Sequence, residues 1–308
     1  DAVITRYITM VRAANGSAIN KYQLYRRALE LNPSDNVKNA LISALSESQT
    51  LPSLMLATNY LDQPNTAFAA ATTVKDIISK NAELQKGATI KKALQKAQDV
   101  FRAQKSNADA GYAVDEISGI LPKFAEKGYE PLVTEATEAT AKKSFSLPKK
   151  YENFEMYLDW KSDSKGTLSL RTMPEVNLDG KAGVTMVYAS KQDKTGNVNA
   201  NDWNTLYIKV VNDRIFVESN GTKVAENAII KNTPETKPIN NSGLIQLLTK
   251  DGSVSIRNLY VNELPSTPVF TLPEEEKKAG FEVLFDGRSL EKWQGNTSAY
   301  VPVDGNIY

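Results

Sequence analysis

The chain has 308 residues, about twice the length of an average domain, so at least two domains are expected. Its composition, 41% hydrophobic and 24% charged, is that of an ordinary globular protein. A formal net charge of +1 does not indicate binding to nucleic acid. With no His and no Cys, the chain cannot form a Ser-His-Asp triad, a thiol nucleophile or a typical zinc site, and no apolar run reaches the ~18–20 residues of a membrane span. We therefore expect no cofactor, no metal, no nucleic-acid partner and no membrane span.

The first residue is Asp1 rather than Met, and no signal peptide precedes the first predicted helix. We expect a processed or excised piece of a longer protein. The absence of cysteine is compatible with the cytoplasm and with an extracytoplasmic protein that has no disulfides, so composition alone leaves the compartment open.

Residues up to about 140 are predicted to be helical. Pro33 and Pro64 each precede a capping residue and an amphipathic helix, and their separation of roughly 30 residues is typical of stacked helical pairs. The stretch "LMLATNYLDQPNTAFAAATTVKDI" predicts a helical hairpin and resembles HEAT-type repeats. Further helices are expected at 87–104 and 107–121. An irregular helical bundle is the alternative.

Near residue 145 the period of the apolar residues changes from 3.6 to 2. In "YENFEMYLDW" every second residue is apolar, and the opposite face carries Glu155, Tyr157 and Asp159. Strand-like stretches follow to about residue 264 and are separated by turns, among them Asn212-Asp213 and Asn220-Gly221. This pattern predicts an all-β sandwich. The stretch "PSTPVFTLPEEEKKAG" is rich in proline and charge and predicts a linker.

Two stretches of the predicted sandwich resemble a known family. "NDWNTLYIKVVNDRIFVESNGTKV" and "NSGLIQLLTKDGSVSIRNLYVNEL" are similar to the second half of the bacterial 3-keto-disaccharide hydrolase domain, which resembles family 16 glycoside hydrolases. The resemblance covers about residues 148–264 and implies a concanavalin-like jelly roll. The expected fold is a multidomain α and β chain, with a HEAT-like helical repeat followed by this jelly roll.

The stretch "FEVLFDGRSLEKW", followed by "VPVDGNIY", is similar to the opening of the same family's domain. We interpret it as the start of a second jelly-roll copy, although these strands could instead complete the first sheet. The expected domains are 1–142 helical repeat, 143–265 jelly roll, 266–279 linker and 280–308 opening strands of the second copy.

In family members thought to act on sugars, two strands carry the polar residues, with the forms Asn-Ser-Gly-Ile-x-x-Arg and Gly-Tyr-Glu-Val-Gln. The matching stretches are taken to be "KGTLSLR" and "GVTMV", which keep Arg171 but have Thr185 and Val187 in place of Glu and Gln. The resemblance thus implies a sheet face that binds sugar but lacks its obvious acid or base. The candidate carbohydrate-binding residues are Arg171, Tyr188, Tyr157 and Glu155, and no catalytic residue is assigned.

The carboxylates of Glu155 and Asp159 lie at i and i+4 of one strand, about 13 Å apart along an extended chain. Glycosidases place their two carboxylates ~5–10 Å apart, so these two are a poor catalytic pair, and we interpret them as solvated strand-face charges. Tyr157 and Tyr188 could stack on a sugar ring, or they could simply stabilise the sheet.

The leading hypothesis is a fragment of a periplasmic or extracellular bacterial protein for carbohydrate breakdown. By resemblance the family is a glycoside hydrolase or cleaves 3-keto-glycosides, and we expect this jelly roll to bind sugar or pack against the second copy and to be inactive alone. The expected partners are an oligosaccharide or glycoside and a second jelly roll of the same chain. Two alternatives stay open: a non-catalytic scaffold built on helical repeats, and an enzyme that uses Arg171 with nearby carboxylates.

Overall fold

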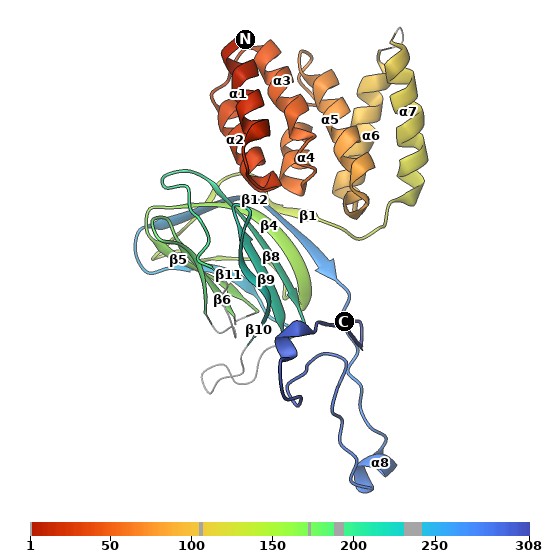
Figure 1. The fold of residues 1–308 in the computed structure, drawn as a ribbon, viewed down its shortest axis with the longest axis vertical. Coiled ribbons are helices and arrows are strands. Elements are labelled where there is room, and N and C mark those ends of the chain that lie inside the picture. Colours follow the sequence, from red (N-terminus) through yellow and green to blue (C-terminus); the bar gives the residue numbers. More distant parts are fainter. Residues whose placement is uncertain (1, 105–106, 172–173, 188–193, 231–241) are drawn as a thin grey trace. The chain divides into compact units, whose positions relative to one another are not determined.

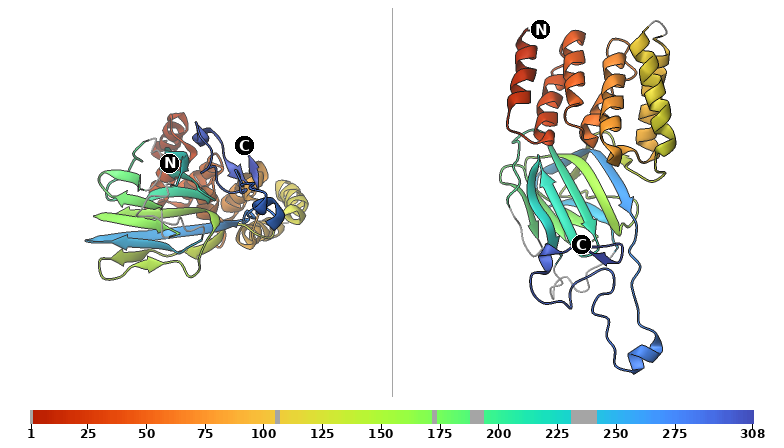
Figure 2. Two further views of the ribbon diagram at one scale, coloured as in Figure 1. Left: turned by 90° about the horizontal axis from the view of Figure 1, so that it is seen from below. Right: turned by 45° about the vertical axis from the view of Figure 1, so that its right-hand side comes forward.

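A computed structural model describes residues 2–104, 107–171, 174–187, 194–230 and 242–308. It divides the chain into two compact units, Asp1–Pro131 and Leu132–Tyr308. The first unit is built of helices, and the second contains the β-sheets (Figures 1 and 2). Each unit is described by itself.

Consecutive helices of the first unit lie side by side (Figures 1 and 2). The helices are α1 (Ala2–Ala13), α2 (Ala18–Glu30), α3 (Asp35–Leu45), α4 (Leu51–Thr58), α5 (Ala67–Lys80), α6 (Ala88–Arg102) and α7 (Ala108–Ile120). Their buried faces repeat at three- and four-residue spacing, as on α5 at Ala70, Val74 and Ile77. Side-chain caps fix several starts; Ser17 and Asn20, for example, form a reciprocal capping box on α2. The helices predicted at 87–104 and 107–121 are confirmed as α6 and α7.

The second unit is a sandwich of two antiparallel sheets. Its strands are β1 (Glu130–Val133), β2 (Thr137–Thr140), β3 (Phe145–Ser146), β4 (Asn153–Ser162), β5 (Lys165–Leu170), β6 (Glu175–Asp179), β7 (Gly183–Val187), β8 (Asn204–Val211), β9 (Arg214–Ser219), β10 (Thr222–Ile229), β11 (Ile245–Thr249) and β12 (Ser253–Leu264). The larger sheet has the order β1-β12-β4-β8-β9-β10, with β2 also paired to β12, and the smaller has the order β3-β11-β5-β6-β7. The predicted sandwich is confirmed.

One hydrophobic core lies between the two sheets. Alternate residues of β4 enter it, including the fully buried Phe154, Met156 and Trp160. Leu168 of β5 and Val176 of β6 enter it from the smaller sheet. Because successive side chains of a strand point to opposite faces, the residues between them project away from the core.

The turns at Asn212-Asp213 and Asn220-Gly221 join β8 to β9 and β9 to β10, as predicted. Asn212, Asn220 and Gly221 all have positive φ angles, which Asn and Gly adopt at the lowest cost. The larger sheet begins earlier than the sequence suggests, because β1 and β2 lie inside the segment 1–142 that was predicted to be helical. These strands have four residues each, too few to establish a period of two.

Residues 266–308 follow β12 and contain α8 (Glu274–Lys278) and a separate hairpin of β13 (Pro302–Val303) and β14 (Asn306–Ile307). This hairpin forms a two-stranded sheet of its own. The segment contacts the end of the sandwich, where Asn212 Nδ2 donates to Pro302 O at 3.2 Å and Ser289 Oγ donates to Asp213 Oδ2 at 3.0 Å. Within the described residues, neither strand of the hairpin joins the larger or the smaller sheet.

Candidate functional site

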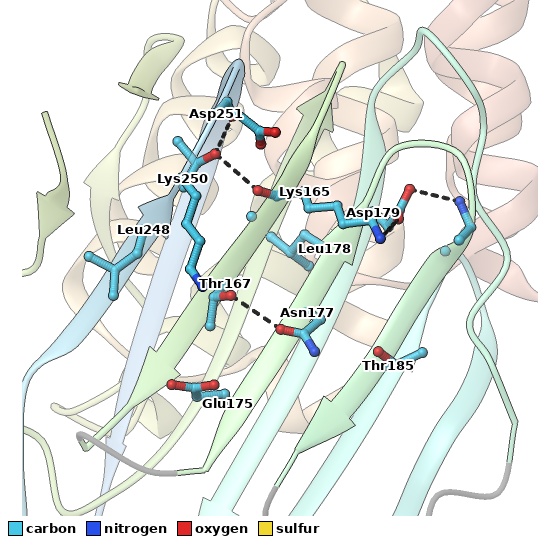
Figure 3. Close-up of a pocket in the computed structure, with 14 residues that line it drawn as sticks. Lys165, Thr167, Glu175, Asn177, Leu178, Asp179, Thr185, Leu248, Lys250 and Asp251 are labelled. Atoms are coloured by element: carbon cyan, nitrogen blue, oxygen red, sulfur yellow. Dashed lines mark hydrogen bonds and ion pairs between the residues drawn. The ribbon is translucent and has the colours of Figure 1, made fainter. Parts of the chain in front are cut away.

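The face of the smaller sheet that points away from the core carries polar side chains. On β6, Val176 and Leu178 are fully buried in the core. Glu175, Asn177 and Asp179 alternate with them and therefore project to the opposite side (Figure 3). One five-residue strand thus presents two carboxylates and an amide on one face.

Cross-strand register aligns this face into rows. Thr167 of β5 and Thr185 of β7 both lie opposite Asn177, and Lys165 lies opposite Asp179. Thr167 Oγ1 donates a hydrogen bond to Asn177 Oδ1 at 3.2 Å, and Lys165 Nζ lies 3.7 Å from Asp179 Oδ2 (Figure 3). The rows are linked by hydrogen bonds and charge as well as by strand pairing.

A groove of about 850 Å³ follows these rows across β11, β5, β6 and β7. Its size lies within the ~300–1,000 Å³ of small-molecule sites. Leu248 adds an apolar surface, and Lys250 extends along the groove from the turn after β11 (Figure 3). Its other polar lining residues include Lys165, Thr167, Glu175, Asn177, Asp179 and Thr185.

The two groove carboxylates on β6 differ in their surroundings. Asp179 Oδ1 accepts hydrogen bonds from the backbone N–H groups of Lys181 and Ala182, both at 2.9 Å. The Ala182 bond, followed by the Lys181 bond, lowers the pKa of Asp179 because both stabilise the charged form. Within the part of the chain that the structure describes, the Glu175 side chain has no such partner and lines the groove with its charge uncompensated by a direct contact.

Glu175 and Asn177 were not predicted as groove residues. The acidic position of this face was expected at Thr185, and the acid was therefore predicted to be lost. Thr185 does line the groove, but a carboxylate and an amide are supplied by the neighbouring strand, in "EVNLD". The alternation of polar and apolar residues in that stretch is the signal that could have found them.

Arg171 lies at the end of β5 and has no exposed surface. Its Nη2 donates to Asn212 O at 2.7 Å, and its Nη1 donates to Glu152 O at 3.2 Å. Burial lowers the pKa of Arg171 to about 10, and the charges of Glu152 and Asp213 oppose this shift. The guanidinium thus lies inside the end of the sandwich and joins backbone segments there.

Glu155 and Tyr157 lie together on β4, on the outer face of the larger sheet. Glu155 is 8% exposed and accepts hydrogen bonds from Asn262 Nδ2 at 2.7 Å and Tyr207 Oη at 3.2 Å. The rings of Tyr157 and Tyr207 are 4.7 Å apart, and burial raises the pKa of both phenols. Since these residues belong to the opposite sheet, the structure does not bring them to the groove.

The expectation that Glu155 and Asp159 are solvated is wrong. Asp159 is only 2% exposed and accepts hydrogen bonds from Thr205 Oγ1 at 2.7 Å and Asn258 Nδ2 at 3.0 Å. Cross-strand polar partners cover both carboxylates, which strand alternation alone does not reveal. Tyr188, the remaining predicted contact, lies outside the described residues.

No group of three or more acidic side chains that could hold a metal ion occurs in the described ranges. The polar groups of the groove can instead donate and accept hydrogen bonds, because amide, hydroxyl, ammonium and carboxylate groups all line it. The arrangement suits an uncharged ligand with many hydroxyl groups.

The chain is weakly similar to several solved structures, with which it shares little sequence. No curated protein matches the sequence. Among solved structures, two proteins of Parabacteroides distasonis taken to be glycosyl hydrolases are similar, with 12% and 17% identity and a TM-score of 0.34 each; the matches cover 42% and 44% of this chain and 81% and 100% of theirs. The carbohydrate-binding module CBM66 of Bacillus subtilis is 12% identical with a TM-score of 0.31, and the match covers 44% of this chain and 96% of that module.

The model of the 3-keto-alpha-glucoside-1,2-lyase-like domain matches residues 101–262, more than half of the 308-residue chain. This span contains the groove strands β5, β6, β7 and β11. The family predicted from the sequence of the sandwich domain is therefore confirmed. The chain belongs to the 3-keto-alpha-glucoside-1,2-lyase-like domain family.

Proposed function

We propose that the groove on the smaller sheet binds a saccharide. The observation that carries this proposal is the row of Thr167, Asn177 and Thr185 across three strands of a carbohydrate-related domain, flanked by Glu175 and by Lys165 paired with Asp179. Sugar hydroxyl groups both donate and accept hydrogen bonds, and these side chains supply both kinds of partner. Leu248 offers the apolar contact that a sugar ring face needs.

The two carboxylates that β6 contributes to the groove do not form a glycosidase pair with each other. Glu175 and Asp179 lie four residues apart on one strand, roughly 13 Å along the chain, whereas glycosidases separate their carboxylates by about 5–9.5 Å. Asp179 is also held as an anion by two backbone N–H groups, so it is a poor general acid. These two residues therefore favour saccharide binding over hydrolysis by this pair.

A second candidate function follows from Glu175 alone. In a 3-keto-glucoside the carbonyl acidifies the proton on C2, and elimination needs one base to remove it. The C2–H electrons then form the C1–C2 double bond as the C1–O bond breaks, and the departing oxygen is protonated from solvent. Glu175 lines the groove, and no cation among the described residues pairs with its carboxylate, so its oxygen atoms can accept a proton from a bound ligand.

Several finer assignments stay predictions. These are the carbohydrate contacts of Arg171, Tyr188, Tyr157 and Glu155, the second jelly-roll copy at 280–308, and the HEAT-like repeat as a scaffold for a partner. We also propose a periplasmic or extracellular location from the family. No helix among the described residues is long and apolar enough to cross a membrane.

Calorimetric titration with methyl α-glucoside and its 3-keto derivative tests both candidates, with product analysis run on the same samples. Binding that Asn177→Ala weakens supports the saccharide groove. Release of methanol from the keto sugar by the wild type, lost in Glu175→Gln while binding persists, supports elimination. If neither sugar binds to the wild type, the groove proposal is wrong.

A further inference from the structure

The stretch "LFDGRSL", which was predicted to open a second jelly roll, forms a hydrogen-bonded turn. Asp286 Oδ1 accepts hydrogen bonds from the backbone N–H groups of Arg288 at 2.8 Å and Ser289 at 2.9 Å. Gly287 has a φ angle of 89°, and a Cβ there would lie 3.1 Å from Pro268 O, so the turn packs closely on the chain before it. The turn thus fixes the backbone from which the side chains of Arg288 and Ser289 project.

Both of these side chains contact the end of the sandwich. Ser289 Oγ donates a hydrogen bond to Asp213 Oδ2 at 3.0 Å. Arg288 Nη2 lies 3.1 Å from Glu152 Oε1, and Arg288 Nε donates to Thr267 O. The side chains of Arg288 and Glu152 are only 19% and 26% exposed, so water and salt screen this ion pair less than a pair on the open surface.

Two asparagines of the sandwich hold the chain further along. Asn212 Nδ2 donates to Pro302 O at 3.2 Å, and Asn227 Nδ2 donates to Tyr300 O at 3.1 Å. Leu290, which follows the Arg-Ser pair, is buried, so an apolar side chain is removed from water as well. Contacts of three kinds, ionic, hydrogen-bonded and apolar, therefore accompany the segment from residue 284 to residue 302.

The groups on the sandwich that receive this segment are oriented by the sandwich itself. Arg214 Nε lies 3.1 Å from Asp213 Oδ1, and the Arg214 side chain is buried. The backbone N–H of Asn212 donates to Asn153 Oδ1 at 2.8 Å. A surface whose carboxylates are oriented in this way suits a polypeptide turn that carries a cation next to a hydroxyl group.

The chain between the two sets of contacts is exposed. Residues 273–282, which include α8, all lie on the surface. Contacts with the sandwich are made before this stretch, where Ser266 Oγ donates to Glu152 Oε2 at 2.7 Å, and after it, by Arg288. A cut within the exposed stretch would therefore leave the contacts on both sides in place.

We infer that the end of the sandwich is an interaction surface for residues 284–302 of the same chain. Its contact residues are Glu152, Asn212, Asp213 and Asn227. The surface holds the opening residues of the predicted second jelly roll against the first one, so the exposed linker does not set their separation. These four residues differ from the residues that line the groove, and the docking does not require a saccharide.

The test cuts the chain within the exposed stretch and asks whether the two pieces stay together. The recognition sequence of a specific protease is inserted after Lys278 in the full chain, and the cleaved protein is followed by native mass spectrometry over a dilution series. The wild-type pieces should remain bound to each other. Arg288→Met should raise the Kd between them about tenfold, because the segment loses a charged donor, and Ser289→Ala should raise it about fivefold.

The matched control is Lys292→Met, which removes a cation of the same segment. Lys292 Nζ donates to Val283 O, a contact that stays within one piece after cleavage, so this variant should match the wild type. All three substitutions lie outside the sandwich strands, and its folding should not change.

Two results would overturn the inference. Separation of the wild-type pieces at every concentration would show that the end of the sandwich does not bind the segment. The same Kd for Arg288→Met, Ser289→Ala and Lys292→Met would show that the assigned contacts do not hold it. Calorimetry of the uncleaved variants with methyl α-glucoside should match the wild type, so a failure of this inference and a failure of the saccharide groove can be told apart.

Discussion

Thr167 Oγ1 donates a hydrogen bond to Asn177 Oδ1 at 3.2 Å across neighbouring strands of the smaller sheet. This bond orients the Asn177 side chain so that its amide nitrogen points away from Thr167 (Figure 3). Since Asn177 lies at the centre of the groove, the contact sets the direction of one donor before a ligand binds.

Replacing Asn177 with Ala should weaken saccharide binding about fivefold, because one net hydrogen bond contributes roughly 1 kcal/mol. Folding should change little, since Asn177 is only partly buried and its partner Thr167 can turn to water. Calorimetry gives the affinity, and Asn306→Ala, on β14 far from this face, is the matched control. Unchanged affinity in Asn177→Ala would remove this residue from the site.

Replacing Arg171 with Met should destabilise the second unit by about 3 kcal/mol, because the carbonyls of Asn212 and Glu152 lose their buried donor. All three tryptophans of the chain, Trp160, Trp203 and Trp293, belong to this unit, so their fluorescence follows its unfolding in urea. Saccharide affinity of the folded variant should match the wild type. A large loss of affinity without a loss of stability would instead support the predicted sugar contact of Arg171.

Asp179 should make the stability of the second unit depend on acid pH. Its folded-state pKa lies below the ordinary value of 3.8, so the ionised carboxylate stabilises the fold above that value, and the contribution disappears as the pH falls through the lowered pKa. Asp179→Asn keeps an oxygen acceptor but cannot ionise. The wild type should therefore be the more stable protein at pH 6, and the difference should shrink toward pH 3. A difference that does not change with pH contradicts this role.

Tyr207→Phe should lower the stability of the second unit by about 1 kcal/mol, because buried Glu155 loses a hydrogen-bond donor. Tyr157→Phe provides the comparison on the same face, and tryptophan fluorescence in urea again gives the stability. Neither variant should alter binding in the groove on the opposite sheet. If Tyr157→Phe weakens saccharide binding, the predicted contact of Tyr157 on the larger sheet is supported and a second binding surface must be added.

The regular elements could be predicted because each spans enough residues for the spacing of its apolar side chains to be recognised. Helix α6 and strand β4 each repeat their apolar residues over ten or more positions, and the Asn-Gly turn before β10 is specified by local chemistry. Strands β1 and β2 were missed because four residues with few apolar positions carry no such signal. Their strand state depends on pairing with β12, a contact distant in sequence.

The site was harder to predict than the fold. The sequence identified the correct neighbourhood at β5 and β7 but not the strand between them, so Glu175 and Asn177 were overlooked. Arg171 was selected by motif, and nothing in the motif indicates that its guanidinium is buried. Which sheet faces a ligand is decided by tertiary packing, so Glu155 and Tyr157 could not be separated from the groove by local pattern.

The most direct test of the groove is a backbone amide NMR titration of the full chain with methyl α-glucoside and maltose. We predict chemical-shift changes at 165–169, 175–185 and 245–251, with strands β4, β8 and β9 of the larger sheet unaffected. Changes confined to β4, β8 and β9, or no changes at saturating sugar, would show that the groove does not bind these sugars.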